Sequence, residues 1–332
     1  MKTITVGVLG AGRIGRLHTD NLLRMPGVRV KAIADPFVDF TGWPPDGVAT
    51  GVDPGLVLGD HEIEAVLICS PTPTHAPFTE AAAAAGKHVF CEKPIDLEPG
   101  RIRRTLEAVE RAGVKLQVGF NRRFDPTFAR VRRAVVDGDV GTVQIVKITS
   151  RDPEAPPVSY VQSSGGIFLD MTIHDFDMVR FLTGGEVAEV FAMGAVLIDP
   201  AIGEAGDIDT AVTTMVMADG ALAVVENSRQ AVYGYDQRVE VFGSKGSAEA
   251  GNETPNRVTV SGADGVRADN PLYFFLERYQ ASFLAEMAAF FDCIRDDREP
   301  PVGGLDGLMS VLVGQAAARS IVERRPVPVE RP

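Results

Sequence analysis

Runs of branched apolar residues alternate with amphipathic segments over the first 120 residues. Residues 4–9, 28–34 and 65–69 are continuous apolar runs, which are typical of strands buried on both faces of a parallel sheet. Residues 13–25 have helical spacing and end before a Pro-Gly pair. Further elements of the same pattern are expected as strands at 88–92 and 114–120, and as helices at 75–85 and 98–112. This alternation predicts a doubly wound, Rossmann-type parallel sheet.

Residues 37–60 depart from that pattern. The run Trp-Pro-Pro-Asp-Gly over 43–47 interrupts any helix, because proline removes a backbone donor and clashes with the preceding turn. We expect a surface loop here, in place of the second helix that such a domain usually contains.

After residue 121 the pattern changes to strands with alternating polar and apolar positions, as in VQIVKI over 143–148. Such alternation is typical of an antiparallel sheet with one packed and one exposed face. The expected strands are 143–150, 187–198, 210–217, 221–227 and 238–242, and the expected helices are 126–136, 165–182, 274–293 and 305–322. The sequence therefore predicts an α/β plus α+β protein. A parallel Rossmann domain covers 1–121, and a mostly antiparallel open sheet covered by helices occupies 122–332.

The segment 165–182 is expected to be one helix that begins at a glycine pair and ends before Gly184. Asp170 and His174 are four residues apart, so in one helix their side chains leave the same face about one turn apart. A carboxylate beside an imidazole suits proton transfer near neutral pH, because it fixes the tautomer and stabilises the charged ring. A structural contact or a pair of metal ligands would use the same residues. The apolar stripe that this helix can bury consists of Ile167, Met171, Met178 and Leu182.

The charge balance disfavours some partners. The chain has 332 residues, with 33 Lys and Arg against 45 Asp and Glu, which gives a net charge of −12. A nucleic acid or an anionic membrane needs a surplus of cations, so a neutral small molecule is the more compatible ligand.

The cysteines and the apolar segments bear on the compartment. Cys69, Cys91 and Cys293 have no ligand-like spacing, which disfavours a disulfide framework or structural zinc and favours a reducing compartment. We find no signal-peptide pattern at the N-terminus and no run that approaches a membrane span. A cytoplasmic protein is expected.

A glycine-rich turn joins the first strand to the first helix. In such a turn Gly10 allows the sharp bend, Gly12 lets a pyrophosphate approach the backbone, and Gly15 allows close packing of helix on strand. Asp35, 20 residues after Gly15, is placed to take the adenosine ribose hydroxyls and to repel a 2′-phosphate, which favours NAD over NADP. The candidate cofactor contacts of the turn are Gly10, Ala11, Gly12, Arg13, Ile14 and Gly15.

Lys93 follows the expected strand at 88–92. The carboxyl ends of parallel strands hold the ligands of such sheets, so we expect Lys93 near the nicotinamide, with a solvated surface lysine as the equal alternative. Other candidate cofactor contacts at these strand ends are Ser70, Pro71, Thr72, His75 and Glu92.

Together these motifs resemble the Gfo/Idh/MocA family of NAD(P)-dependent sugar and cyclitol dehydrogenases. The resemblance covers nearly the whole chain, and it is strongest to the members that oxidise inositols. The chain departs from the family over 37–60, which is shorter and richer in proline. The motifs that carry the resemblance are the glycine turn, FCEKP at 90–94, FNRRFD at 120–125, SRDP at 150–153, DMTIHDFD at 170–177 and NSRQAVYGYD at 227–236.

The resemblance implies a catalytic set of Lys93, Asp170 and His174. In these roles His174 is the base that takes the hydroxyl proton, Lys93 stabilises the developing alkoxide and contacts the nicotinamide ribose, and Asp170 orients the substrate. The implied reaction is the NAD-dependent oxidation of a cyclic polyol, first of all myo-inositol to 2-keto-myo-inositol (scyllo-inosose), in inositol catabolism. No metal is expected.

An uncharged polyol calls for hydrogen-bonding side chains around it. For Arg123 an ion pair across the domain boundary is an equal alternative, and for each tyrosine a place in the core or in a subunit interface is slightly favoured over substrate contact. Besides the catalytic set, the candidates are Arg123, Asp152, Thr172, Tyr233 and Tyr235.

Three rival interpretations remain at this point. The substrate is scyllo-inositol, another inositol isomer or an aldose such as glucose; or the protein is a nucleotide-binding regulator without catalysis; or Asp170 and His174 bind a metal, although no third histidine or cysteine is suitably spaced. The resemblance also implies a homo-oligomer, a dimer or tetramer, formed through the exposed face of the C-terminal sheet.

Overall fold

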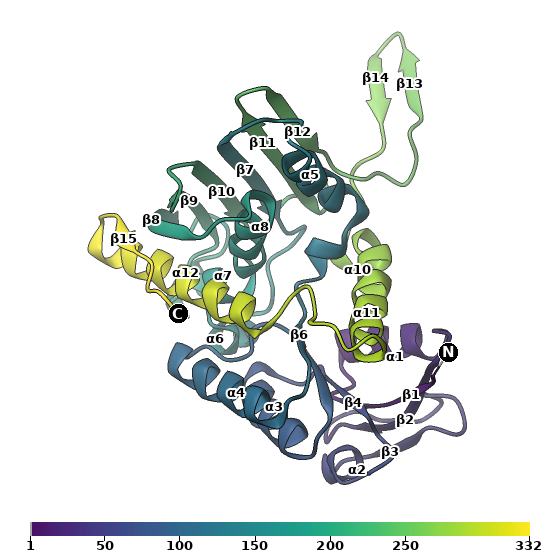
Figure 1. The fold of residues 1–332 in the computed structure, drawn as a ribbon. Coiled ribbons are helices and arrows are strands. Elements are labelled where there is room, and N and C mark those ends of the chain that lie inside the picture. Colours follow the sequence, from purple (N-terminus) through teal and green to yellow (C-terminus); the bar gives the residue numbers. More distant parts are fainter. Residues whose placement is uncertain (1) are drawn as a thin grey trace. The chain divides into compact units, whose positions relative to one another are not determined.

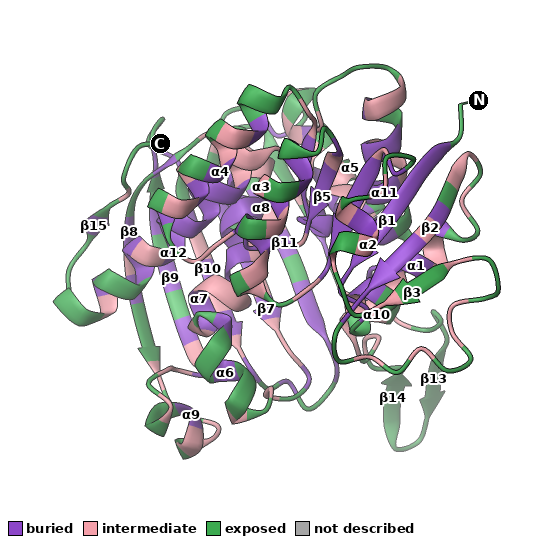
Figure 2. Cartoon of the chain, turned by 90° about the horizontal axis from the view of Figure 1, so that it is seen from below, coloured by how far each residue is buried: buried purple, intermediate pink, exposed green. Residues whose placement is uncertain are grey.

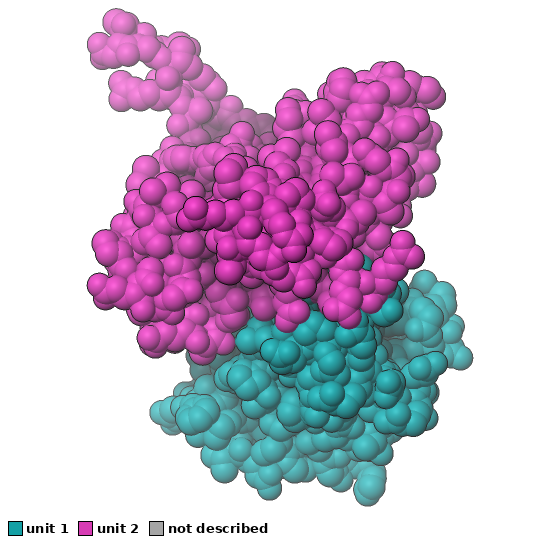
Figure 3. All heavy atoms as spheres, turned by 90° about the vertical axis from the view of Figure 1, so that its left-hand side faces the viewer, with its two compact units in different colours: residues 1–120, 283–311, 332 teal, residues 121–282, 312–331 magenta. Residues whose placement is uncertain are grey.

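The computed structural model describes residues 2–332, and the chain divides into two compact units (Figure 3). One unit consists of Met1–Phe120, Phe283–Val311 and Pro332, and the other of Asn121–Ser282 and Leu312–Arg331. The first unit therefore includes a late segment of the chain, in addition to the residues expected in the Rossmann domain.

The first unit contains a six-stranded parallel sheet in the order β3-β2-β1-β4-β5-β6 (Figure 1). Its strands are β1 (Ile4–Leu9), β2 (Val28–Ala34), β3 (Ala49–Gly51), β4 (Ala65–Ile68), β5 (His88–Cys91) and β6 (Leu116–Val118). Its helices are α1 (Arg13–Leu22), α2 (Gly55–Leu58), the 3-10 turn η1 (Thr72–Thr74), α3 (His75–Ala84) and α4 (Pro99–Ala112). The strand order confirms the expected Rossmann fold.

The apolar runs bury the sheet on both faces. Every residue of β1 and β4 is buried, as the purple ribbon of β1 in Figure 2 shows. The aromatic and sulfur side chains of Met287, Phe290 and Phe291 pack into the same core. They come from α11 (Gln280–Arg295), the part of the chain that returns to this unit late in the sequence.

The segment 37–60 is more ordered than the expected surface loop. It contains β3, which pairs with the end of β2, and the single turn α2. Trp43 anchors the proline-rich part, since its indole NH donates to Asp20 of α1 at 2.8 Å and the Arg16 guanidinium lies 4.5 Å from its ring. A three-residue edge strand and a one-turn helix are too short to produce a periodic signal, which is why the sequence did not predict them.

The second unit contains a seven-stranded mixed sheet in the order β12-β11-β7-β10-β9-β8-β15. The strands β7 and β10 pair in parallel and the other pairs are antiparallel, which confirms the expected mostly antiparallel sheet. The strands are β7 (Val143–Arg151), β8 (Val187–Ala195), β9 (Thr210–Met217), β10 (Leu222–Ser228), β11 (Asp236–Gly243), β12 (Gly246–Ala250) and β15 (Val327–Pro328). A separate hairpin of β13 (Thr259–Gly262) and β14 (Gly265–Ala268) projects away from this sheet (Figure 1).

Helices cover one face of this sheet. Contacts join α5 (Pro126–Val136) to β11 and β12, and α8 (Ile173–Thr183) to β7. The remaining helices are η2 (Asn121–Phe124), α6 (Val158–Ser164), α7 (Gly166–Asp170), α9 (Pro200–Glu204), α10 (Phe275–Arg278) and α12 (Gly304–Glu323), the last of which belongs partly to each unit.

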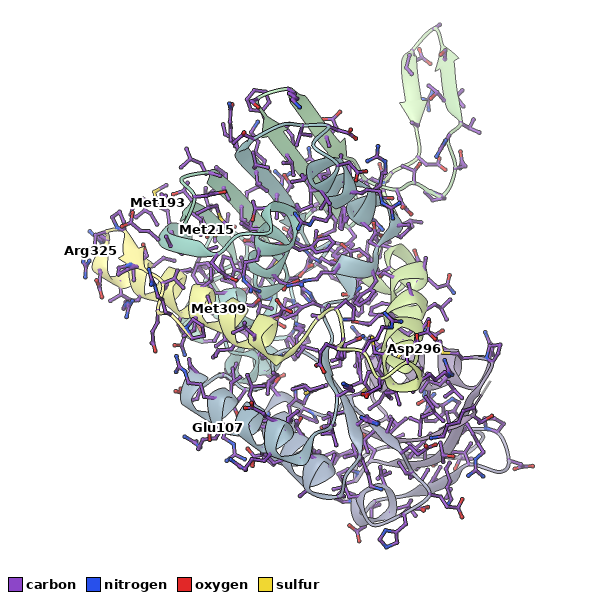
Figure 4. All side chains as sticks on the ribbon, viewed as in Figure 1. Glu107, Met193, Met215, Asp296, Met309 and Arg325 are labelled. Atoms are coloured by element: carbon purple, nitrogen blue, oxygen red, sulfur yellow. The ribbon has the colours of Figure 1, made fainter. Side chains whose placement is uncertain are left out.

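The other face of the sheet is exposed. Along β9 buried and exposed residues alternate strictly from Ala211 onward, which can be followed in Figure 2. Met193 on β8 is 58% exposed, whereas Met215 on the adjacent β9 is 2% exposed (both labelled in Figure 4). The period of two therefore separates a packed face from an open face that carries large apolar side chains.

The helix α12 bears on the expectation that no run of the chain approaches a membrane span. The helix α12 is 20 residues long and has a mean hydropathy of 1.2, which by length and composition alone is enough to cross a membrane. Of its apolar window 61% is buried inside the protein. Its apolar side chains are thus packed in the folded chain, as in the core helix of a globular protein.

Candidate active site

The three glycines of the turn after β1 have different surroundings. A Cβ atom on Gly10, whose φ is +93°, would lie 2.4 Å from the backbone nitrogen of Ser70, and one on Gly15 would lie 2.1 Å from the carbonyl oxygen of Gly10. A Cβ on Gly12 would meet nothing within 4 Å. Gly10 and Gly15 are therefore required by the fold itself, whereas Gly12 leaves open space at the N-terminus of α1, where a phosphate fits.

Asp35 links the end of β2 to this turn. Its Oδ2 accepts a hydrogen bond of 2.7 Å from the amide of Ala11, and its Oδ1 accepts from Phe37 and Val38 at 2.8 and 3.2 Å. A carboxylate can accept about four hydrogen bonds, so one acceptor position is left for a ribose hydroxyl. The residues around the turn thus fit a bound dinucleotide, and they hold the acidic side chain at the end of β2 where the sequence places it.

His75 connects two strand ends within the first unit. Its ring is 2% exposed, with Nε2 2.6 Å from the carbonyl oxygen of Ser70 and Nδ1 2.7 Å from that of Pro94. Burial lowers the pKa of His75, and the two carbonyl groups oppose that shift. These contacts tie the segment after β4 to the residue that follows Lys93. They give His75 a structural role, and its contact with a cofactor stays a prediction.

Glu92 points its carboxylate into the first unit. Its Oε1 lies 2.8 Å from Nε2 of His18, a fully buried residue of α1. A Cβ on Gly119 would lie 2.8 Å from Oε2, so that glycine makes room for the carboxylate. Glu286 on α11 is also fully buried, and burial together with the charge of Glu92 raises its pKa well above the usual range. The half-buried Lys93 therefore follows directly after a half-buried glutamate whose charge acts on the fully buried Glu286, a residue that the sequence did not indicate.

The expected helix over 165–182 is two helices. The amide of Thr172 and the amide before it both donate to the carbonyl of Ile167, at 2.9 and 3.0 Å, which shifts the hydrogen-bond ladder by one residue. Asp170 ends α7 and His174 lies in the first turn of α8. The two side chains are thus not neighbours on one regular helix, and the spacing argument from the sequence was wrong in this respect.

Other features of that segment are confirmed. The four apolar residues of the stripe are buried, and Gly184, with a φ of 73°, forms the left-handed cap of α8. His174 itself is half-buried.

The break at Thr172 has a cause in the second unit. Thr172 is fully buried, and its hydroxyl donates to the side-chain oxygen of Asn227 at 3.0 Å. The side-chain amide of Asn227 donates to Oδ2 of Asp175 at 2.7 Å, and Arg122 donates to Oδ1 of Asp175 at 2.5 Å. Thr172 therefore joins α8 to β10, which gives it a structural role, and its contact with a polyol stays a prediction.

Arg123 forms an ion pair with a carboxylate of its own unit. Its Nε and Nη2 donate to the two oxygens of Asp177 at 2.8 and 2.5 Å, in a bidentate contact within the second unit. This supports the structural alternative for Arg123 over the substrate contact.

The two tyrosines also have protein partners. Tyr235 is 7% exposed and its hydroxyl accepts from Arg122 at 3.4 Å. Tyr233 donates to Asp236 at 2.6 Å and accepts from Arg151 at 2.8 Å. Tyr235 is therefore a core residue, while Tyr233 is 36% exposed and lines a surface hollow of about 380 Å³.

Asp152 and Asp170 share an acidic environment. Asp152 follows β7 and is half-buried; burial and the charge of Asp170 raise its pKa to about 7, against the opposing effect of Arg229 and Arg122. Tyr160 of α6, which the sequence did not single out, donates to Oδ1 of Asp170 at 2.8 Å. The second unit thus brings together two carboxylates that can hydrogen-bond the hydroxyls of a ligand, and the pKa of Asp152 lies near neutral pH.

Comparisons with known proteins agree with this architecture. Residues 4–120 match the oxidoreductase family with an NAD-binding Rossmann fold, and residues 128–249 match the GFO/IDH/MocA C-terminal domain. The chain is 49% identical to an uncharacterized oxidoreductase of Bacillus subtilis, over 99% of this chain and 97% of the relative. It is 47% identical to a myo-inositol 2-dehydrogenase of Thermotoga maritima, over 98% of both. A crystal structure of scyllo-inositol dehydrogenase from Lactobacillus casei, with bound NAD(H) and scyllo-inositol, has 32% identity, 99% coverage of both chains and a TM-score of 0.92.

Proposed function

Because the chain belongs to the Gfo/Idh/MocA oxidoreductase family, we propose that it oxidises a cyclic polyol with NAD, and that myo-inositol is its first candidate substrate. The observation that carries this proposal is the 47% identity to a myo-inositol 2-dehydrogenase over nearly the full length of both chains. The chain has an NAD-binding Rossmann domain, and both myo- and scyllo-inositol dehydrogenases are among its homologues.

The proposed reaction removes a proton and a hydride from one secondary alcohol. His174 takes the hydroxyl proton, and Lys93 stabilises the negative charge that develops on the oxygen. Asp170 accepts a hydrogen bond from the substrate and orients it. NAD, when bound, accepts the hydride from the carbon. The products are a ketone, NADH and a proton, so atoms and electrons balance.

The proposed substrate site suits an uncharged ligand. The carboxylates of Asp152 and Asp170 accept hydrogen bonds from hydroxyls, and their proximity disfavours an anionic substrate. The net charge of −12 acts in the same direction. Arg123, Thr172 and Tyr235, by contrast, are engaged within the second unit and are left out of the proposed lining.

We propose NAD rather than NADP as the preferred cofactor. The carboxylate of Asp35 would repel a 2′-phosphate, and the amide of Ala11 already fixes its position.

A homo-oligomer is proposed on the basis of the exposed sheet face. Large apolar side chains on β8, β9, β10 and β11 are exposed there, and an exposed apolar surface of this kind is typical of an interface. Sedimentation velocity of the wild type against a Leu222→Glu variant tests this proposal, because the variant should shift the protein to a smaller species. The exposed apolar residues are Met193, Val212, Val216, Leu222 and Phe242.

We also propose a cytoplasmic location. Cys69, Cys91 and Cys293 are free thiols, and all three are buried. Three unpaired cysteines fit a reducing compartment.

The substrate is tested by initial rates of NADH formation with myo-inositol, scyllo-inositol, other inositol isomers and glucose. The proposal expects the highest kcat/KM for myo-inositol with NAD. A higher value for scyllo-inositol or for glucose would reassign the substrate within the family, and no NADH with any of these compounds would favour the non-catalytic regulator.

A further inference from the structure

Arg229 connects Asp170 to a second carboxylate. It directly follows β10 and its side chain is 1% exposed. Its Nη1 donates to Oδ2 of Asp170 at 3.3 Å, and its Nη2 donates to Oδ2 of Asp207 at 3.4 Å. One buried guanidinium thus bridges two carboxylates that are 37 residues apart in the sequence.

Asp207 is itself fixed to the beginning of α7. Its Oδ1 accepts a hydrogen bond of 3.1 Å from the amide of Ile167. A Cβ on Gly166, whose φ is +76°, would lie 2.8 Å from that same oxygen. The glycine therefore makes room for the carboxylate of Asp207. The helix that begins at this contact ends, one turn later, at Asp170.

Side chains from other segments hydrogen-bond both ends of the short helix α7. Asp207 accepts a hydrogen bond from the first turn of α7, and Arg229 joins Asp207 to Asp170, the last residue of that helix. The position of the Asp170 carboxylate is therefore set by Arg229 as well as by the backbone of α7. A planar guanidinium favours this geometry, because its two terminal nitrogens can serve two carboxylates at once. Tyr160 hydrogen-bonds the remaining oxygen of Asp170 from a partly exposed position, with 48% of its surface open to solvent.

We propose that Arg229, held by Asp207, is a positioning residue that fixes the carboxylate of Asp170 for the polyol. This inference rests on the proposed function, and it assigns a positioning role to Arg229 and Asp207, which act through Asp170. Loss of the bridge should allow Asp170 to move. A misplacement of about 1 Å at a reacting centre can cost about 10²-fold in rate.

The first test compares Arg229→Lys with the wild type. Lysine keeps the charge but provides a single ammonium, which cannot bridge the two carboxylates in the same way. The expected result is a fall in kcat for myo-inositol of about 10²-fold, with the NAD dissociation constant within about twofold of wild type, since the change in binding free energy would be well under 1 kcal/mol. Wild-type kcat in a folded Arg229→Lys variant would overturn the proposal.

Gly166→Ala is a second test, because it leaves Arg229 itself intact. The new methyl group would displace Asp207, and kcat should again fall while NAD still binds. The matched control is Gly138→Ala: this glycine also has a positive φ, +78°, but a Cβ there meets nothing within 4 Å. The control reproduces the backbone strain without the collision. Equal loss of kcat in both variants would show that strain alone is responsible, and would contradict the bridge.

A third measurement separates positioning from general stability. Burial and the charges of Asp170 and Asp175 raise the pKa of Asp152. The positive charges of Arg229 and Arg122 lower it. In an Arg229→Gln variant the carboxyl titration of Asp152, followed by carbon NMR, should therefore move above about 7. An unchanged midpoint would place Arg229 away from the two acids. If the wild type oxidises no polyol, the proposed function fails; if it does and these variants match it, only the present inference fails.

Discussion

His18 on α1 lies with its Nε2 2.8 Å from Oε1 of Glu92, the residue immediately before Lys93. The histidine is fully buried between the rings of Phe90 and Phe283, at centroid distances of 5.3 and 5.6 Å. The carboxylate of Glu92 thus has a hydrogen-bond partner inside the first unit. Its charge disfavours ionisation of the fully buried Glu286.

The first prediction concerns Glu286. Burial and the charge of Glu92 raise the pKa of Glu286 in the native state, whereas in the unfolded chain this pKa is about 4.5. Above pH 4.5 the native state therefore keeps a proton that the unfolded chain has lost. Stability from this group is complete below pH 4.5 and is lost as the pH rises towards the native pKa. Glu286→Gln keeps the shape and cannot ionise. In urea unfolding, the free energy of unfolding of the variant should therefore rise relative to that of the wild type from about pH 5 upwards. The difference should grow by about 1.4 kcal/mol for each pH unit until the native pKa is reached. Parallel pH profiles of the two proteins would contradict a protonated Glu286.

The glycine turn yields a second prediction, because its glycines differ in surroundings. Gly12→Ala should fold with nearly wild-type stability, since its Cβ meets no protein atom, but it should weaken NAD binding at least about tenfold by blocking the approach of the pyrophosphate. Gly15→Ala should lower the melting temperature strongly, because its Cβ would collide with the carbonyl of Gly10. Calorimetry and NAD titration measure the two effects. Normal NAD affinity in Gly12→Ala would place the cofactor elsewhere.

The third prediction tests cofactor preference. Asp35→Asn should keep an acceptor for the amide of Ala11 while removing the charge that repels a 2′-phosphate. The ratio of kcat/KM for NAD to that for NADP should therefore fall, by about tenfold for each 1.4 kcal/mol of lost discrimination. Asp39→Asn, an exposed change four residues later, is the control and should leave the ratio as it is. If Asp35→Asn also leaves the ratio unchanged, the ribose assignment is wrong.

The fourth prediction concerns the proposed base and the proposed charge stabiliser. His174→Ala and Lys93→Ala should each lower kcat by about 10²–10⁴-fold, the usual contribution of a positioned proton-transfer group. NAD binding should remain largely intact. The exposed residues His61 and Lys147 provide matched controls, whose alanine variants should keep wild-type turnover. Near-normal turnover of His174→Ala at neutral pH would rule out its role as the base.

Asp152 gives a prediction about pH. Its native pKa of about 7 exceeds the ordinary value of 3.8, so its contribution to stability is complete below about pH 4 and is lost as the pH rises to about 7. The Asp152→Asn variant has no carboxyl group that can titrate at this position. The free energy of unfolding of the wild type, relative to the variant, should fall between pH 4 and 7 and stay constant above it. Asp264→Asn on the hairpin is the control. A flat difference over that range would show that Asp152 is ionised throughout.

Local signals in the sequence were sufficient for the fold and for the turn after β1. Gly15 is required by a contact within the turn and Gly10 by its positive φ, and such local requirements leave a readable spacing. The parallel strands were also predictable, because burial on both faces produces continuous apolar runs.

The rest depended on contacts between distant residues. Arg229 reaches Asp170 over 59 positions, and Arg123 reaches Asp177 over 54. No periodicity or spacing encodes such pairs. The break between α7 and α8 was missed for the same reason, since Asn227, 55 residues away, holds the hydroxyl of Thr172. Helical spacing alone therefore overestimated the regularity of the segment that carries Asp170 and His174.

The most direct test of the proposed function uses myo-inositol labelled with deuterium on carbon 2. The wild-type protein is mixed with this substrate and NAD, and the NADH that forms is examined by mass spectrometry and NMR. We expect one deuterium at nicotinamide C4 for each inositol oxidised, together with a slower rate than with unlabelled substrate. Unlabelled NADH, or no NADH at all from any inositol isomer, would contradict the proposed function.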